Sequence, residues 1–333
     1  MTEAGDKAQR IEAALTGALQ SQAPLIVGPW IGEVGYELLY WIPFVRWALA
    51  SRPVSSRPVI VVSRGGVSSW YAGLGMDRYV DAFDLMPPEE LTALAGGGKP
   101  KQSATAGDPA GDELVARVQS LCGLRDVNRL LPHWMYRLYR PYWDGDAPID
   151  SLSARADWSR ILPPPAPASA EPWPRNFIAV RFYFSRSFPQ NETNRRFART
   201  LLDTLAARMP VVLLNHGFSI DDHRDYEPSG NQVRSVAHLM TPSTNLAMQT
   251  AVIGRAAVFV GTYGGLSLLP PVCGVPSYAY CSVPFMKASH ETAIGCMIDR
   301  AHGAPLHVGD TSDGAAQAGR ILADLRENRG VDG

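Results

Sequence analysis

VFVGTYGGLSLLPPVCGVPSYAYCS, residues 258–282, is the stretch on which the interpretation of this chain depends. Its apolar start, Val258–Val260, predicts a buried strand, and Gly261–Gly265 predicts a small, flexible turn. Residues 266–273 then predict a short helix, and residues 277–281 predict the next strand. A strand, glycine turn, helix and strand in this order form an α/β crossover, so the stretch predicts a parallel sheet.

The glycine turn allows two interpretations. Its free N–H groups and the positive end of a helix dipole would lie at the carboxyl edge of a sheet, where open α/β sheets bind phosphates. A tight connection without a ligand is equally consistent with the pattern. No Lys follows the glycines, so this is not the phosphate loop of nucleotide hydrolases, and it is not G-x-G-x-x-G. Because proline fits only the first turn of a helix, Pro270 and Pro271 predict a helix that starts near Leu269 or is kinked there.

The composition limits the class of protein. A chain of 333 residues is long enough for two domains with full cores, and 46% hydrophobic with 19% charged residues is an ordinary globular balance. The formal net charge of −1 argues against a nucleic-acid partner, because phosphate contacts need a surplus of Lys and Arg.

Cysteine spacing and hydropathy indicate the compartment of the cell in which the protein is found. Cys122, Cys273, Cys281 and Cys296 lack C-x-x-C spacing, which favours free thiols in a reducing cytoplasm over a zinc or redox site. Residues 1–20 lack the apolar core of a signal peptide, and no window approaches the ~18 apolar residues of a membrane span. We therefore expect a cytoplasmic protein that is either soluble or peripheral to a membrane.

The first half of the chain alternates strand-like and helix-like segments. Residues 24–27, 58–63 and 80–85 predict strands. Residues 95–113, rich in Gly, Ala, Ser and Pro, predict a mobile surface loop. Residues 162–175, LPPPAPASAEPWPR, predict a stiff proline-rich linker, and the domain boundary is placed there.

The second half repeats the pattern. Further strands are predicted over residues 177–184, 210–215 and 233–240, and helices over residues 193–208, 245–255 and 314–328. The predicted fold class is therefore α/β, with two Rossmann-like domains and a cleft between them. The predicted parts are a first domain over residues 1–162, a linker over residues 163–175 and a second domain over residues 176–333.

Polar residues of the second half follow predicted strands. Arg181 lies within a strand, where a charge must be paired or face a site, and Arg186 lies just beyond it. Guanidinium groups suit a diphosphate because they offer fixed forks of donors, so both arginines and the glycine turn are expected to converge on one edge of the sheet. A surface or salt-bridged arginine is the alternative for each residue alone. The candidate phosphate-binding residues are Arg181, Arg186, His216, Gly261, Thr262, Tyr263, Gly264, Gly265 and Ser267, of which Thr262 and Ser267 would add hydroxyl donors.

Two carboxylates follow the first strand. Glu33 and Glu37 are four residues apart, so a helix would place them on one face, and Gly32 and Gly35 allow a tight turn there. A carboxylate in a cleft can take a proton from an acceptor hydroxyl within hydrogen-bond reach. The alternative is a capping role in the first turn of a helix.

Residues 130–143, LLPHWMYRLYRPYW, predict an aromatic helix. An apolar face formed by Leu131, Trp134, Met135, Leu138 and Tyr142 would lie opposite Arg137 and Arg140. A packed helix is the favoured interpretation. The alternative is that Arg137 and Arg140 contact an acceptor or a membrane surface.

Two stretches resemble glycosyltransferases of the GT-B fold, above all bacterial surface-polysaccharide and heptosyltransferase-like enzymes. FVGTYGGLSLLPPVCGVPSYAY, residues 259–280, resembles their donor-phosphate segment, and GEVGYELLYWIPFVRW, residues 32–47, resembles their first glycine loop. Glu37 lies six residues before Pro43, a spacing similar to that of the family's acidic base, whereas Glu33 lies ten before it. The resemblance therefore favours Glu37 as the base without excluding Glu33. The usual histidine near the end of the donor turn is absent, with Ser267 and Leu268 in that region, and no ribose-binding carboxylate is identifiable.

The resemblance implies an enzyme of glycan or surface-polysaccharide biosynthesis. It implies a nucleotide-sugar donor held by the second domain, a carbohydrate or lipid-linked carbohydrate acceptor held by the first, and inverting transfer without a metal or other cofactor, in the cytoplasm or at the inner membrane. Two alternatives stay open. One is a nucleotide-sugar epimerase of the same fold, using His216 or His290, and the other is a sugar-nucleotide-binding module without catalysis.

Overall fold

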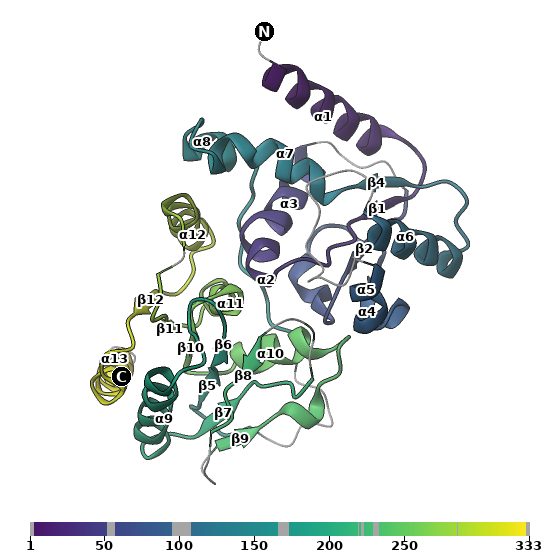
Figure 1. Cartoon of the computed structure of the whole chain (residues 1–333). Helices are drawn as coiled ribbons and strands as arrows, with labels where there is room; N and C mark the ends of the chain where they lie inside the picture. The colour runs from purple at the N-terminus through teal and green to yellow at the C-terminus, as the bar shows by residue number, and fades with distance from the viewer. Residues whose placement is uncertain are drawn as a thin grey trace. The chain divides into compact units, whose positions relative to one another are not determined.

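The computed structural model divides into two units (Figure 1). It describes residues 3–51, 57–94, 108–165, 173–218, 220, 223–228, 233–284 and 286–330. Of these, unit 1 contains the described residues of Met1–Leu162, Pro242–Ala247 and Lys287–Ala301. Unit 2 contains those of Pro163–Thr241, Met248–Met286 and His302–Gly333.

Unit 1 is built on a parallel sheet with the strand order β3 (Arg78–Asp81), β2 (Val59–Ser63), β1 (Leu25–Val27) and β4 (Asn128–Leu130). β1 and β2 are buried along their whole length, as expected of short apolar runs in a parallel sheet. Helix α6 (Pro109–Cys122) packs Val115 and Val118 against Ile26, Ile60 and Val62 of the sheet. This face of the sheet forms an aliphatic core.

The remaining helices of unit 1 are mostly short. The chain after β1 forms one continuous helical stretch whose middle turn is a π-helix, so its turn is wider than an α-helical one. These elements are α1 (Glu3–Gln20), α2 (Val34–Tyr36), the π-helix η1 (Glu37–Trp41), α3 (Ile42–Ser51), the 3₁₀-helix η2 (Val67–Tyr71), α4 (Ala82–Leu85), α5 (Pro88–Leu94), α7 (Pro132–Trp143), α8 (Ile149–Ser153) and α12 (Ala288–Arg300).

Unit 2 is built on a parallel sheet with the strand order β12 (Leu306–Gly309), β11 (Ser277–Tyr280), β10 (Val258–Thr262), β5 (Ile178–Arg181), β7 (Val211–Leu213) and β9 (Val233–Ser235). The order along the chain reverses between β5 and β10, which makes this the doubly wound arrangement with its switch point between those two strands. An antiparallel ribbon of β6 (Tyr183–Phe184) and β8 (Arg224–Asp225) continues from β5.

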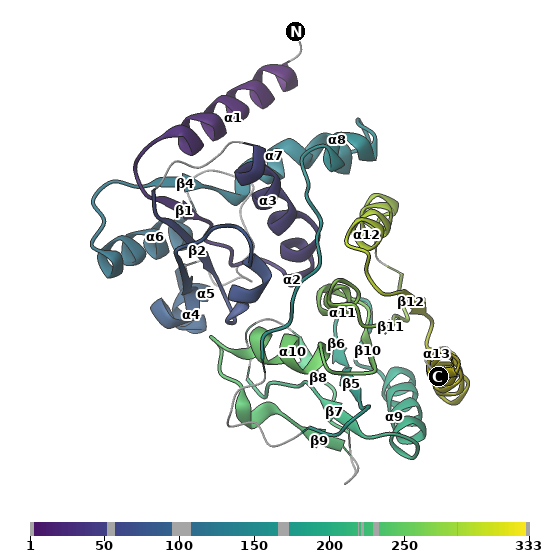
Figure 2. The same ribbon diagram turned by 180° about the vertical axis from the view of Figure 1, so that it is seen from behind.

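Helices cover both faces of this sheet (Figures 1 and 2). On one face α9 (Glu192–Ala206) and α13 (Gly314–Gly330) pack Leu201, Leu205 and Ile321 against Val180 and Val260. On the other lie α10 (Asn245–Ile253) and α11 (Leu269–Cys273), the latter preceded by the 3₁₀-helix η4 (Gly265–Leu268). A further 3₁₀-helix, η3 (Ala237–Leu239), follows β9. The predicted fold class, α/β with two Rossmann-like halves, is confirmed.

Two segments of the second half of the chain belong to unit 1. The first is Pro242–Ala247, whose Ala247 amide donates to the Gly65 carbonyl over 2.9 Å. Gly66 has a φ of +78°, and a Cβ there would lie 2.9 Å from the Ser243 carbonyl oxygen, so only glycine fits. The second segment is α12, which connects β11 to β12 of the other unit's sheet. A single second domain over residues 176–333 therefore does not describe the contacts.

Several predicted elements need correction. The strand predicted over residues 80–85 ends at Asp81, because the Asp81 side chain accepts from the Phe83 amide and caps α4. The strand predicted over residues 233–240 ends at Ser235 and is followed by η3. Of the predicted loop 95–113, residues 95–107 lie outside the described residues. The rest is a helix start, with Asp108 as N-cap and Pro109 in the first turn of α6.

The helix after the glycine turn begins as predicted, since α11 starts at Leu269 with both prolines in its first turn. Residues 166–172 of the predicted linker lie outside the described residues, and the cleft stays a prediction. Among the described residues, no helix combines the length and the apolar character needed to cross a membrane.

Candidate functional site

The switch point of the unit 2 sheet brings two predicted site elements together. β5 and β10 are neighbours, and Arg181 is the register partner of Gly261. The glycine turn and Arg181 therefore lie at the carboxyl ends of adjacent strands, where doubly wound sheets bind ligands. The predicted convergence of Arg181 with the glycine turn is confirmed.

Arg181 already has partners within unit 2. Its Nε lies 3.2 Å from Asp225 Oδ1, and the two side chains are only 9% and 11% exposed. Its second guanidinium nitrogen lies 2.8 Å from Nε2 of His216. Because arginine can only donate, His216 accepts at Nε2. Arg181 and His216 thus form a nearly buried cluster with Asp225, a partner that the sequence analysis did not identify.

The glycine turn uses most of its own polar groups. The Thr262 hydroxyl donates to the Tyr183 carbonyl over 2.9 Å, and that of Ser267 donates to the Gly264 carbonyl over 2.7 Å. The expectation that both hydroxyls are free donors is therefore wrong. The amide of Tyr263 donates to the Tyr280 carbonyl. The amide of Gly264, the next residue along the turn, donates to the Ser267 hydroxyl oxygen over 3.3 Å.

Gly264 has to be a glycine. A Cβ there would lie 2.1 Å from the Tyr183 phenol oxygen, so the phenol packs directly on the backbone of the turn. The ring of Tyr183 in turn contacts His223, with 4.4 Å between ring centroids. This contact gives one side of the turn an aromatic wall.

Arg186 is the cation that this edge presents to solvent. Its side chain is exposed, and its neighbour Ser187 donates a hydrogen bond to the Tyr263 carbonyl over 3.2 Å. Within the described residues, Arg186 forms no ion pair. The segment that carries it is therefore attached to the glycine turn, while its charge is uncompensated.

The two predicted carboxylates of unit 1 lie in different environments. Glu33 is exposed and precedes α2, but its side chain makes no capping hydrogen bond. Glu37 is fully buried in η1, where its Oε1 accepts from Ser63 over 2.5 Å and from Tyr71 over 2.7 Å. The expectation that one helix face presents both carboxylates is wrong, because the helical stretch turns Glu37 into the core.

The environment of Glu37 favours its protonated form. Burial raises its pKa to about 7, against the opposing effects of Arg64 and of the hydrogen bonds from Ser63 and Tyr71. Oε2 of Glu37 is buried without a hydrogen-bond partner in the described residues. A proton on Oε2 removes the charge that burial disfavours.

A second buried carboxylate lies in the same unit, at the end of β3. Asp81 accepts from the Gly66 amide over 2.6 Å and from the Tyr79 hydroxyl over 3.0 Å, and burial raises its pKa to about 6. Arg64 donates to the Gly32 carbonyl and so ties the end of β2 to the loop that carries Glu33. Ser63, Tyr71 and Asp81 were not predicted as site residues, although Ser63 and Asp81 end strands on the ligand edge.

Arg137 and Arg140 are both exposed on α7, as the helical spacing predicted. Arg140 is paired with Asp144 over 2.6 Å. Met135, Tyr139 and Tyr142 form the buried face of the helix. The packed aromatic helix is thus present, and an acceptor contact of the two arginines stays a prediction.

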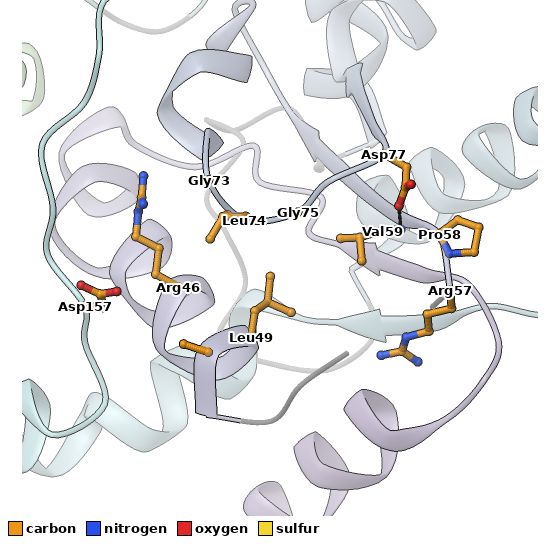
Figure 3. Close-up of a pocket in the computed structure, with 11 residues that line it drawn as sticks. Arg46, Leu49, Arg57, Pro58, Val59, Gly73, Leu74, Gly75, Asp77 and Asp157 are labelled. Carbon is orange, nitrogen blue, oxygen red and sulfur yellow. Dashed lines mark hydrogen bonds between the residues drawn. The ribbon is translucent and has the colours of Figure 1, made fainter. Parts of the chain in front are cut away.

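Unit 1 also has a pocket at the opposite, amino-terminal edge of its sheet, with a volume of about 610 Å³ (Figure 3). Two of its charged side chains form hydrogen bonds with the backbone. Arg57 donates to backbone carbonyls of Leu19, Ser21 and Ala23, and Asp77 accepts from the Val59 amide. These bonds join β2 to its surroundings, so the pocket walls have a structural role.

Within the described residues, no three His, Cys, Asp or Glu side chains gather as metal ligands would. Unit 2 has an exposed cation, Arg186, and a glycine turn. Unit 1 has an exposed carboxylate, Glu33, and two buried carboxylates, Glu37 and Asp81.

No protein-family model and no curated protein matches this chain. Solved structures do resemble it. One is a family 9 glycosyl transferase from Veillonella parvula, with 12% identity, a TM-score of 0.45, and coverage of 89% of this chain and 88% of that one. Another is the E. coli ADP-heptose LPS heptosyltransferase II, with 12% identity, a TM-score of 0.45, and coverage of 92% and 99%.

A third similar structure is an E. coli heptosyltransferase solved with ADP, with 12% identity, a TM-score of 0.43, and coverage of 92% and 99%. At these identities and TM-scores the likeness concerns the general α/β architecture alone. It carries no inference about the reaction.

Proposed function

We propose that this protein is a glycosyltransferase that moves a sugar from a nucleotide-sugar donor to a hydroxyl of a carbohydrate or lipid-linked carbohydrate acceptor, in glycan or surface-polysaccharide biosynthesis. The observation that carries the proposal is the switch point of unit 2, where a glycine turn and Arg181 lie on adjacent strands. Doubly wound sheets bind nucleotides at that place.

Arg186 is assigned to the donor diphosphate. It is exposed and uncompensated within the described residues, and its segment is hydrogen-bonded to the glycine turn through Ser187. Charge-assisted bonds from guanidinium to phosphate oxygens are stronger than neutral ones. Arg181 and His216, already paired with each other and with Asp225, would shape this site and hold β5 against β8.

Glu33 is assigned as the general base. A base must come within hydrogen-bond reach of the acceptor hydroxyl, and Glu33 is exposed whereas Glu37 is buried. Glu37 would stabilise the segment that carries Glu33, through the hydrogen bonds that it accepts from Ser63 and Tyr71.

The proposed reaction is a single displacement with inversion. The acceptor oxygen forms a bond to the anomeric carbon as the bond from that carbon to the diphosphate oxygen breaks. The acceptor proton passes to the Glu33 carboxylate, and Arg186 stabilises the charge that develops on the leaving diphosphate. The donor and acceptor are substrates, and the step needs no metal.

The donor is tested by thermal unfolding against a panel of sugar nucleotides and the matching free nucleotides. A specific donor raises the midpoint, because a ligand that binds only the native state stabilises it by mass action. Arg186→Ala should reduce the shift, and Arg326→Ala, an exposed arginine on α13, should leave it intact. No shift with any member of the panel would count against the whole proposal.

The base is tested by transfer rates of Glu33→Gln, Glu37→Gln and the double variant. We expect Glu33→Gln to lose a factor of about 100 or more in kcat, as general bases contribute on that order. Glu192→Gln, at the start of α9, is the control. Near-normal rates in the double variant would remove both carboxylates from the mechanism.

A further inference from the structure

We propose that His290 is a positioning residue for the acidic segment Glu33–Glu37, acting through the hydroxyl groups of Tyr36 and Tyr40. The proposal rests on the proposed function for what the segment does. Its structural part concerns unit 1 alone and can be measured separately.

His290 lies between two phenols of one helical stretch. Its Nδ1 lies 2.5 Å from the Tyr40 oxygen, and its Nε2 lies 3.2 Å from the Tyr36 oxygen. The imidazole also packs on both rings, with centroid distances of 5.5 Å to Tyr36 and 5.7 Å to Tyr40. One side chain therefore holds both residues.

Tyr36 and Tyr40 lie on either side of Glu37 in the sequence. Tyr36 ends α2, Glu37 starts η1, and Tyr40 lies within the π-turn. A π-helix is rare and occurs mostly as a single turn inside an α-helix, frequently at a functional site. Ser63 and Tyr71 hold this turn through Glu37, and His290 holds it through the two phenols. The path of the chain from Glu33 onward depends on both supports.

Imidazole chemistry suits this position. A neutral ring has one N–H donor and one acceptor nitrogen, so it can donate to one phenol and accept from the other. Burial, together with Lys287, lowers the pKa of His290 and so favours the neutral ring. Phenylalanine would keep the ring contacts and lose both hydrogen bonds, whereas glutamine could donate and accept as histidine does.

His290 belongs to a helix with a second, independent attachment. The Tyr142 hydroxyl donates to the Ser289 carbonyl, and Arg300 lies over the ring of Trp158 at 5.7 Å. The Tyr142 contact does not involve residues 33–41, whereas Trp158 donates to the Leu39 carbonyl over 2.8 Å. Tyr142→Phe therefore weakens the attachment of α12 without touching the acidic segment, and it provides the matched control.

The experiment compares His290→Phe, Tyr40→Phe, His290→Gln and Tyr142→Phe by hydrogen exchange of the amides of residues 37–41. We expect exchange about tenfold faster in His290→Phe and Tyr40→Phe, because each loses a hydrogen bond that holds the turn. Tyr142→Phe should leave these amides unchanged, and His290→Gln should restore most of the protection. The proposal fails if Tyr142→Phe accelerates them as much as His290→Phe does, or if neither change has an effect.

Transfer kinetics give the second readout. His290→Phe should lower kcat about tenfold with the donor KM within about twofold, because the base is misplaced while the donor site in unit 2 is intact. Tyr142→Phe should leave both constants unchanged. A His290→Phe enzyme with wild-type kcat would overturn the positioning role. If no nucleotide-sugar is turned over by the wild type, the proposed function fails and the exchange data alone decide whether His290 holds the segment.

Discussion

The carboxyl edges of the two parallel sheets differ in how they hold charge. In unit 2, Arg181 is paired with Asp225 and bonded to His216, and Arg186 is left exposed. In unit 1, Glu37 and Asp81 are buried and, within the described residues, neither forms an ion pair, so burial raises the pKa of both. The same architecture thus supports a fixed cationic edge and an edge whose charge depends on pH.

Under the proposed function, this difference assigns the two substrates to the two edges. A diphosphate leaving group needs a permanent positive charge, which arginine supplies at any ordinary pH. A hydroxyl acceptor needs a group that can take up a proton, which carboxylates supply when their pKa is suitable. The predictions below test this contrast, beginning with the largest expected effect.

Breaking the Arg181–Asp225 pair should have the largest effect. Arg181→Met leaves Asp225 nearly buried without its cation, and removing one partner of a buried pair costs about 3–5 kcal/mol. Urea unfolding followed by circular dichroism measures this. The control is Arg195→Met, at an exposed position of α9 outside this pair. A loss of less than ~1 kcal/mol in the free energy of unfolding of Arg181→Met would show that solvent screens the pair.

Neutralising Glu37 should remove a pH dependence of stability. Its pKa rises from 4.5 to about 7 on folding, so the native state binds the proton more tightly than the unfolded chain. The free energy of unfolding therefore falls as pH rises from 4.5 to 7 and is level above pH 7. The difference in the Glu37 pKa between the two states corresponds to a total decrease of about 3 kcal/mol.

The check is urea unfolding of the wild type and Glu37→Gln between pH 4.5 and 8. Glu37→Gln should gain stability relative to the wild type as pH rises, since its amide carries no charge. Asp81 contributes in the same direction, because burial raises its pKa to about 6. Parallel curves for the two proteins would mean that Glu37 is ionised at no cost.

Removing Arg186 should weaken binding of the donor without lowering the stability of the fold. Arg186→Ala is expected to reduce affinity for the nucleotide-sugar about tenfold or more, because a charged hydrogen bond to phosphate is lost. Calorimetric titration measures it, with unfolding in the absence of ligand as the comparison. An unchanged affinity would move the diphosphate away from this edge.

The smallest effect is expected on α7. Arg140→Ala removes an exposed pair with Asp144, and such pairs contribute little in water. The midpoint of thermal unfolding should not change measurably. A clear loss of acceptor binding with an unchanged midpoint would support the acceptor role predicted for Arg137 and Arg140.

The sequence was informative where periodicity and strand order decide the structure. The run Val258–Val260 predicted β10, which extends two residues further, to Thr262, and the parallel pattern predicted that Arg181 would come next to the glycine turn. The prolines correctly placed the start of α11. These features depend on residues close in sequence or on the general direction of parallel strands.

Partners that are distant in sequence could not be predicted. Asp225 pairs with Arg181 only because the β6–β8 ribbon folds back over β5, and no local pattern indicates that ribbon. The burial of Glu37 depends on a π-turn, which shifts the helical face away from the 3.6-residue spacing. The hydroxyls of Thr262 and Ser267 were misjudged because their acceptors are backbone carbonyls, which sequence does not distinguish.

The excursion of α12 into unit 1 limits how this protein can be recombined. Residues 1–162 alone would lack the helix that bonds Tyr36 and Tyr40 and the segment that fills the space above Gly65 and Gly66. A chimera that joins them to the second half of another enzyme must carry over residues 242–247 and 287–301 as well. The two halves of the chain are therefore not interchangeable modules, and an exchange of halves should also disturb the acidic segment.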